Sequence, residues 1–285
     1  MLLHLSDPHF GTERPQVVEA LVRFARAQQP QVVVLSGDVT QRARRAQFRA
    51  ARALVDRLGA PHVLAIPGNH DIPLFQLLAR ALSPYANFLR EFKELEPVLD
   101  TPELLVVCVK TTRRYRHKNG EVSTAQIEVV AERLRRAREP QLRIVVIHQP
   151  MEVLRAEDEH DRLRGHEAAA RRWAEAGVDL VLGGHIHLPY VLPLHERLPG
   201  LARHLWVVQA GTAVSQRVRD GISNSVNLLR WGGSLPAGRC VVERWDYLAS
   251  TDAFCMVLKT MLDTGPRVDA ILDLSQTANE ADPDI

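Results

Sequence analysis

The hydrophobic pattern of the first part of the chain alternates between two lengths. Short apolar runs, of the kind that forms buried strands, are separated by longer segments with apolar residues at helical spacing. We expect strands at Leu2–Ser6, Val32–Ser36 and His62–Ile66, with helices over Gln16–Gln28 and Arg42–Leu58 between them. This strand–helix–strand order indicates a parallel sheet with right-handed crossovers.

The same alternation continues through the middle of the chain. Ser123 and Gln126 have the S-x-x-Q spacing of a capping box, which is a helix-start signature, and we expect a helix from there to about Ala137. Further helical segments are expected over Leu74–Phe92, with a break near Ser83-Pro84, and over Glu167–Ala176; further strands are expected at Glu103–Lys110, Leu142–His148 and Leu180–Leu182.

The pattern changes after residue 187, where long helices no longer separate the apolar runs. Successive strands are expected at Tyr190–Leu194, Leu205–Ala210, Ser223–Leu229 and Cys240–Trp245, and they favour a second, more antiparallel sheet. Beyond Ala249 the chain has seven acidic residues against two basic ones, and an apolar stripe over Phe254–Leu262 predicts a docking helix. We therefore expect a main domain over 1–246 and an acidic, partly helical extension over 247–285, with its last ten or so residues disordered.

Composition narrows the function classes. The chain has 285 residues with a formal net charge of +2, and this near balance disfavours a nucleic-acid partner, whose affinity would depend on neutralising phosphates. Three widely spaced cysteines make neither a disulfide framework nor a CxxC metal site. The apolar runs are all far shorter than the ~20 residues of a membrane span. Since the N-terminus also lacks a leader pattern, a cytoplasmic protein is expected.

Side chains suited to metal binding follow five of the predicted strands. They lie in Asp7-Pro8-His9, Gly37-Asp38, Gly68-Asn69-His70-Asp71, His148 and Gly183-Gly184-His185-Ile186-His187. Ligands gather at such strand ends in open α/β sheets. Carboxylate, carboxamide and imidazole without thiolate suit two transition-metal ions such as Mn, Fe or Zn. Two ions roughly 3.5–4 Å apart can clamp a phosphoryl group and generate hydroxide near neutral pH.

The ordered motifs D-x-H, GD, GNHD, H and GHxH resemble those of the calcineurin-like metallophosphoesterase superfamily, over roughly Met1–Asp246. The resemblance implies an α/β fold, a four-layer α/β/β/α sandwich of two mixed sheets. The GNHD form, the helical insert Pro73–Phe92 and the turn Ala210-Gly211-Thr212-Ala213 are most similar to the bacterial branch that contains class III cyclic-nucleotide phosphodiesterases.

The resemblance also implies a role for each motif residue. One divalent or trivalent ion would be held by Asp7, His9, Asp38 and His187. The other would share Asp38 as a bridging ligand and would be held also by Asn69, His148 and His185. His70 is not a ligand in this scheme; it would reach the phosphate, to stabilise developing charge or to protonate the leaving oxygen.

One departure from the superfamily pattern bears on the substrate. Its phosphoprotein phosphatases continue the second motif as GDxxDRG, whereas this chain reads Gly37-Asp38-Val39-Thr40-Gln41-Arg42-Ala43. The Asp that partners the catalytic His there is missing, which disfavours protein phosphatase activity. Arg113, in a basic loop, and Arg217 are candidate contacts to an anionic substrate, against solvated-loop and salt-bridge interpretations.

The leading hypothesis is a dinuclear metal-dependent phosphodiesterase that hydrolyses a small-molecule phosphodiester, with a 3′,5′-cyclic nucleotide as the branch-level candidate. A UDP-sugar-lipid pyrophosphate hydrolase and a nuclease of the same superfamily are the alternatives. A nuclease would favour a more basic surface, and a lipid substrate would ask for an apolar cap, which the Leu74–Phe92 insert can supply although packing explains it equally well. A non-catalytic scaffold is a remote alternative, because such a protein should have lost ligands. A homodimer is left open.

Overall fold

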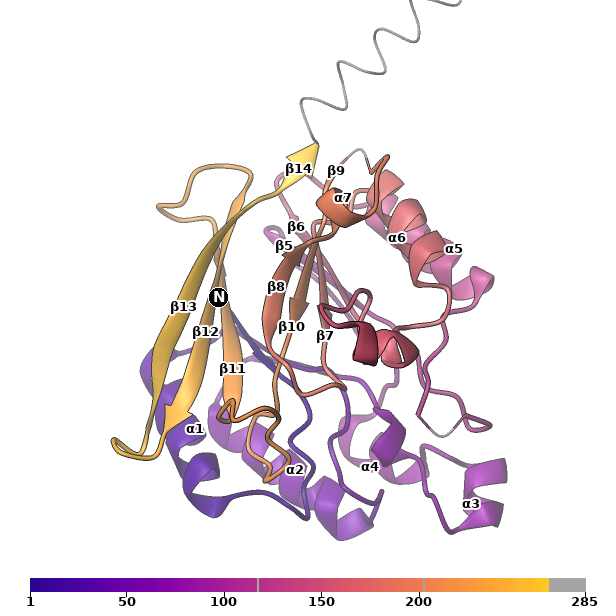
Figure 1. Ribbon diagram of the computed structural model, residues 1–285, viewed down its shortest axis with the longest axis vertical. Helices are drawn as coiled ribbons and strands as arrows, with labels where there is room; N and C mark the ends of the chain where they lie inside the picture. Colours follow the sequence, from indigo (N-terminus) through magenta and orange to yellow (C-terminus); the bar gives the residue numbers. More distant parts are fainter. Residues whose placement is uncertain (117, 202, 267–285) are drawn as a thin grey trace, which may run out of the picture.

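The computed structural model of the protein describes residues 1–116, 118–201 and 203–266. Two large sheets and the helices outside them make up most of it (Figure 1). The helices are α1 (Pro15–Gln28), α2 (Arg45–Leu58), α3 (Leu77–Leu82), α4 (Ala86–Phe92), α5 (Thr124–Arg135), α6 (His166–Glu175) and the short α7 (Leu194–Arg197), with 3₁₀ turns η1 (Asn69–Asp71) and η2 (Ala156–Asp161).

Each large sheet has six strands in mixed orientation. The first runs in the order β13 (Ala253–Asp263), β12 (Arg239–Leu248), β11 (Ser225–Trp231), β1 (Leu2–Leu5), β2 (Val32–Leu35), β3 (His62–Ala65). The second runs β4 (Val98–Asp100), β5 (Leu104–Cys108), β6 (Leu142–Val146), β7 (Leu180–Gly183), β10 (Trp206–Gln209), β8 (Tyr190–Pro193). The strands β1–β3 are mutually parallel, as are β5, β6, β7 and β10. A two-stranded pair, β9 (Arg203–His204) with β14 (Gly265–Pro266), completes the strands.

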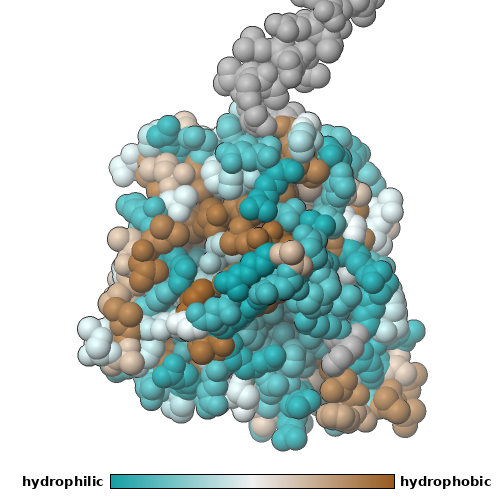
Figure 2. Space-filling view, in the orientation of Figure 1, coloured by the Kyte–Doolittle hydropathy of each residue, from teal (hydrophilic) through white to brown (hydrophobic). Residues whose placement is uncertain are grey.

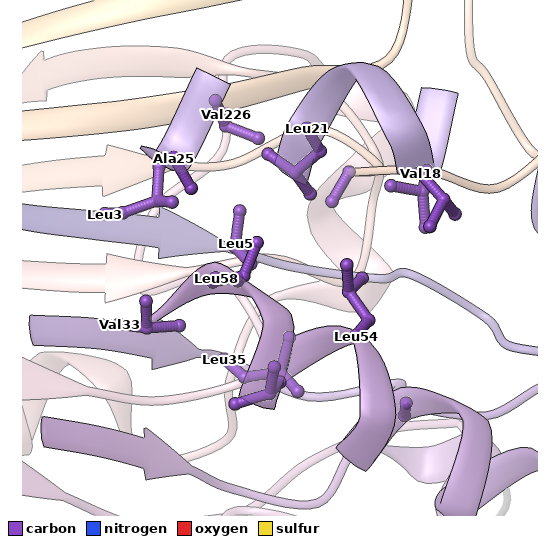
Figure 3. Close-up of a cluster of buried hydrophobic side chains, with 14 of the residues drawn as sticks. Leu3, Leu5, Val18, Leu21, Ala25, Val33, Leu35, Leu54, Leu58 and Val226 are labelled. Atoms are coloured by element: carbon purple, nitrogen blue, oxygen red, sulfur yellow. The ribbon is translucent and has the colours of Figure 1, made fainter. Parts of the chain in front are cut away.

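Three apolar clusters separate four layers. One lies between the first sheet and helices α1 and α2, where Leu3, Leu5, Leu21 and Leu54 meet (Figure 3). A second lies between the other sheet and helices α5 and α6, around Trp173. The third fills the space between the two sheets. Strands buried on both faces require apolar residues at every position, which explains their unbroken hydrophobic runs. The expected α/β/β/α sandwich is confirmed.

Most predicted elements form with small shifts of their bounds. The capping box of α5 is present, since the Ser123 side chain accepts a hydrogen bond from Gln126 N at 3.3 Å. The helical insert breaks into α3 and α4 at Ser83-Pro84 as predicted. Helix α2 begins at Arg45 rather than Arg42, because Ala43 has a left-handed φ of 53° that no helix tolerates.

The expectation of a separate, more antiparallel second sheet was wrong. Strands β8 and β10 instead complete the sheet of β5–β7, and β11–β13 extend the sheet of β1–β3. Both additions cover edges that the parallel strands leave open, with β11 antiparallel to β1 and β10 parallel to β7. Sequence order carries no record of which open edge a later strand will cover.

The docking helix predicted over Phe254–Leu262 was also wrong. This segment forms β13, which pairs antiparallel with the whole of β12. Strand β12 presents a row of unpaired backbone groups, and pairing with them outweighs a local helical spacing of apolar residues. The first sheet therefore continues past the expected boundary at residue 246, to Asp263. The disorder expected for the last ten residues lies outside the described residues.

Over the part of the chain that the structure describes, the helices are all too short or too polar to cross a membrane.

Candidate metal centre

The ends of five strands from both sheets meet at one place. In the first sheet, β1, β2 and β3 lead into Asp7 and His9, into Asp38, and into Asn69 and His70; in the second, β6 and β7 lead into His148 and into His185 and His187. The His148 ring joins the two sheets, since its Nδ1 lies 2.8 Å from the carbonyl oxygen of Ser36. The structure therefore brings the seven predicted ligands and His70 together.

The backbone at this place is held in an unusual conformation. Five residues have positive φ, between 42° and 74°: Asp7, His9, Asp38, His185 and His187. Residues other than glycine seldom adopt this conformation, and its cost is typically met at functional sites. Gly184 has no room for a side chain, because a Cβ there would collide with Ser6 and Asp7. The strand ends are thus shaped to point side chains into a common centre.

The first cluster of potential ligands consists of Asp7, His9 and His187, all buried. Nε2 of His187 lies 3.4 Å from Oδ1 of Asp7, and Nε2 of His9 lies 3.0 Å from Nε2 of His187. The other oxygen of Asp7, Oδ2, accepts the backbone N–H of His185 at 2.8 Å. One carboxylate oxygen is thereby left facing two imidazole nitrogens.

The second cluster consists of Asp38, His148 and His185. Nε2 of His148 lies 3.4 Å from Oδ1 of Asp38 and 3.2 Å from Oδ1 of Asn69. Oδ2 of Asp38 lies 3.6 Å from Nε2 of His9, in the first cluster. The Asp38 carboxylate therefore stands between the two clusters, one oxygen toward each, as a bridging ligand would.

Two buried atoms at this centre have no hydrogen-bond partner among the described residues, and they are Oδ1 of Asp7 and Nδ1 of His185. Such orphaned groups cost free energy unless something pairs with them. Burial lowers the pKa of His9 to about 3, so its ring is neutral, the form that binds metals. Burial opposes a charge on His148 as well, yet the nearby Asp38 raises its pKa to about 9, so the carboxylates of the metal-free centre draw a positive charge into it. The residues present fit a pair of cations.

Acceptors outside the clusters fix several of the histidine rings. Nδ1 of His187 lies 2.6 Å from the Arg217 carbonyl oxygen, and Nδ1 of His148 contacts the Ser36 carbonyl oxygen. On His185 it is Nε2 that faces an acceptor, Oδ1 of Asp161, at 3.4 Å. A bond of this kind selects the tautomer and turns the other nitrogen toward the metal position.

His70 lies beside the clusters, and its side chain is 25% exposed. Its Nδ1 is 3.1 Å from the backbone carbonyl oxygen of Gln41, and its Nε2 is 4.0 Å from Oδ2 of Asp38. Gln41 stands at the sequence position of the aspartate in GDxxDRG, and it contributes its backbone carbonyl oxygen to His70. The ring is therefore oriented by a neutral acceptor, and sequence motifs cannot reveal a backbone partner.

Asp71 holds the loops that carry these residues. Its carboxylate accepts the backbone N–H groups of Val39, Thr40 and Gly68 at 2.8–2.9 Å, together with the Thr40 hydroxyl at 2.8 Å. Burial and the charge of Asp38 raise the pKa of Asp71 to about 7. This residue ties the Asp38 loop to the Asn69 turn.

The two predicted substrate contacts lie in different surroundings. Nη1 of Arg217 is 3.1 Å from Nε2 of His70 and 3.4 Å from the ring nitrogens of His9, so it reaches the centre. Arg113 instead donates to the carbonyl oxygens of Lys110 and Thr112 and to Gln126. Its described contacts hold its own loop together.

Asp161 is a residue of the centre that sequence reasoning missed. It lies on η2, between His148 and α6, and its carboxylate also pairs with Lys118 at 2.7 Å. The sequence offered only a polar loop around it, with several other charged residues as equal candidates. No motif places it against His185.

Comparisons with known proteins agree with this geometry. The family model for calcineurin-like phosphoesterases matches residues 1–189. No curated relative matches the chain. Among solved structures, a dimetal phosphatase from Danio rerio is similar with a TM-score of 0.61 and 14% identity, covering 93% of this chain and 98% of that one. A purple acid phosphatase from seeds of yellow lupin, Lupinus luteus, has a TM-score of 0.69 and 13% identity, covering 95% and 54%.

At 13–14% identity the similar solved structures show the fold alone. The family model, in contrast, matches a segment that contains every motif from Asp7 to His187. The chain therefore belongs to the calcineurin-like phosphoesterase family.

Proposed function

We propose that this protein is a dinuclear metal-dependent phosphodiesterase acting on a small phosphodiester. The observation that carries the proposal is the position of Asp38, with one carboxylate oxygen toward His9 and the other toward His148. A carboxylate whose two oxygens are directed at different ligand clusters can bridge two ions, and a site for a single ion would not require this arrangement. The family is dinuclear and metal-dependent, and its metals here are Mn, Fe or Zn by ligand type.

The seven ligands would hold the two ions as the motifs imply: Asp7, His9, Asp38 and His187 for one, and Asp38, Asn69, His148 and His185 for the other. When bound, such ions supply Lewis-acid polarisation of the phosphoryl group and a nucleophile at neutral pH. The polypeptide contributes fixed ligand directions, since Asp7 and His185 are already tied by a backbone hydrogen bond.

His70 would deliver a proton to the leaving oxygen. The Gln41 carbonyl oxygen, 3.1 Å from Nδ1, orients the ring so that Nε2 faces the centre, and the proton would be delivered from Nε2. A leaving alkoxide needs such an acid, because it departs poorly as an anion. Nη1 of Arg217, which lies 3.1 Å from Nε2 of His70, would pair with a non-bridging phosphate oxygen.

A diester is favoured over a monoester on charge. A monoester brings two negative charges to the centre and a diester brings one. Arg217 is the arginine that contacts the histidines of the centre, whereas Arg219 is already paired with Asp158 at 2.9 Å. A 3′,5′-cyclic nucleotide is the first candidate, on the GNHD motif and the branch it resembles. A bacterial source and a cytoplasmic location belong to the same proposal, and a homodimer is left open.

The test compares hydrolysis of bis(p-nitrophenyl) phosphate and p-nitrophenyl phosphate by one Mn-loaded preparation. We expect a higher kcat/KM on the diester, and turnover of a 3′,5′-cyclic nucleotide in the same preparation. An Asp38→Asn sample purified in parallel reports any contaminating phosphatase. A higher kcat/KM on the monoester would contradict the phosphodiesterase assignment. Failure to hydrolyse either ester would contradict the proposal that the protein is an enzyme.

A further inference from the structure

Helix α3 exposes its apolar side to solvent. The relative exposures are 79% for Phe75, 73% for Leu77, 79% for Leu78 and 83% for Leu82, and we call these four residues the α3 patch. Leu78 and Leu82 are four residues apart and so share one helix face. Arg80 points the other way and donates to the backbone carbonyl oxygens of Pro73 and Arg116. The polarity of this helix is inverted relative to an ordinary surface helix.

Its position makes the α3 patch prominent. The helix lies at the periphery of the fold, beyond α4 and away from both sheets (Figure 1). Figure 2 shows hydrophobic residues gathered over this corner of the molecule, at the lower right. A contiguous apolar patch on a soluble surface marks an interaction site. Because the α3 patch protrudes, it is better suited to insert into an apolar partner than to enclose one.

The surroundings of the α3 patch are cationic. Residues 41–49 contain four arginines and no acid. Residues 110–118 contain five Lys and Arg residues, of which Arg113 and Arg116 pair with Glu121 and Lys118 pairs with Asp161, so Lys110 and Arg114 carry the remaining charge of that segment. Both segments touch the helix region: Arg42 lies over the ring of Phe75, 5.7 Å from its centroid, and Arg114 donates to the carbonyl oxygen of Ala81. A second copy of this chain would bring the same cations to the contact, which disfavours self-association through the α3 patch.

We propose that the α3 patch docks the protein on the surface of an anionic phospholipid bilayer. The leucines and Phe75 would enter the acyl boundary while the arginines face the anionic headgroups, as in interfacial amphipathic helices. The α3 patch also lies toward the metal centre, because the pocket beside His70 and the pocket beside Phe75 share Arg42 and Leu74 in their linings. Docking would place these two pockets close to the bilayer. The inference does not depend on the proposed function.

The experiment measures cosedimentation of the full chain with vesicles, without substrate. One vesicle set is pure phosphatidylcholine and the other contains phosphatidylglycerol. We expect binding to the second set, weakened by added salt. A double variant, Leu77→Ser with Leu78→Ser, should bind at least ~10-fold more weakly, since each leucine loses its apolar transfer energy.

A matched control variant loses two exposed apolar residues, as the α3 double variant does, but on a different part of the surface. Met256 and Leu258 of β13 are each 48% exposed, and Met256→Ser with Leu258→Ser should bind vesicles as the unchanged protein does. Circular dichroism shows whether both variants fold. Failure of the unchanged protein to bind either vesicle would overturn the proposal. Equal vesicle binding by the α3 variant and the unchanged protein would also overturn it. A third contrary outcome is that the unchanged protein dimerises without binding vesicles, whereas the α3 variant is monomeric. Activity assays decide the proposed function separately.

Discussion

Oδ1 of Asp161 lies 3.4 Å from Nε2 of His185, and both side chains are buried. The other ring nitrogen of His185 has no hydrogen-bond partner among the described residues. A carboxylate on one imidazole nitrogen fixes the ring and makes the other nitrogen a better ligand. Asp161 is itself anchored by Lys118, at 2.7 Å. This chain of contacts positions His185 from outside the cluster.

Replacing Asp161 should therefore weaken metal binding. In Asp161→Asn we expect the affinity for one of two Mn ions to fall by ~10–100-fold, because the acceptor charge behind His185 is lost. Titration of metal-free protein by calorimetry measures this without any substrate. Asp158→Asn is the control, because Asp158 is a buried carboxylate of the same turn that pairs with Arg219 instead. An equal loss in both variants would show a fold effect in place of a positioning one.

The contrast between Asp161 and Asp38 shows what sequence can reveal here. Asp38 follows a buried strand within a motif, and the parallel arrangement of β1–β3 then dictates where it lies. Asp161 and the Gln41 carbonyl reach the centre through loop paths, which depend on packing far from them in the sequence. The helix prediction for the segment of β13 failed for a related reason, since its conformation is set by pairing with the open edge of β12 and not by the spacing of its own apolar residues.

Asp38 should be the residue whose loss releases most metal. Asp38→Ala removes a carboxylate that faces both clusters, so we expect loss of both ions and of activity. Asp7→Ala removes a potential ligand of the first cluster only, and although it also frees the backbone N–H of His185, it should retain more metal than Asp38→Ala. Elemental analysis after gel filtration gives the metal content, and circular dichroism shows that the fold persists. Full metal content in Asp38→Ala would refute a bridging role.

Asp71 is expected to matter for stability more than for chemistry. Asp71→Ala leaves three buried backbone N–H groups and one hydroxyl without their acceptor. Each unsatisfied buried group costs about 1–3 kcal/mol, so the free energy of unfolding should fall by about 3 kcal/mol or more. Urea denaturation measures it. The control, Asp56→Ala, removes an exposed carboxylate and should change the value by less than about 0.5 kcal/mol.

The two candidate substrate arginines should behave differently. Arg217→Ala removes a guanidinium that contacts His70 and His9, and we expect kcat/KM for a diester to fall by roughly tenfold or more. Arg113→Ala removes bonds to the 110–126 segment and should lower the melting temperature more than it lowers kcat/KM. Steady-state kinetics and thermal unfolding of both variants decide this. A larger kinetic loss in Arg113→Ala would restore that residue as the substrate contact.

The role of His70 can be separated from that of the ligands by the choice of leaving group. Its ring nitrogen Nε2 is 4.0 Å from Asp38, and its Nδ1 is held by the Gln41 carbonyl. A general acid is needed only when the leaving oxygen is poor, and such acids contribute ~10²–10⁴-fold. p-Nitrophenolate leaves well without a proton, whereas a ribose alkoxide does not.

His70→Ala should therefore retain both ions, and it should slow a 3′,5′-cyclic nucleotide much more than bis(p-nitrophenyl) phosphate. If His70 instead stabilises charge on the phosphoryl group, both substrates should lose rate about equally. Loss of one ion would show that His70 is a ligand, as its inclusion with His9 and Asp38 in a third potential cluster allows. Metal content together with kcat/KM on the two substrates distinguishes the three outcomes, because only the general-acid role makes the rate loss depend on the leaving group while the metals stay bound.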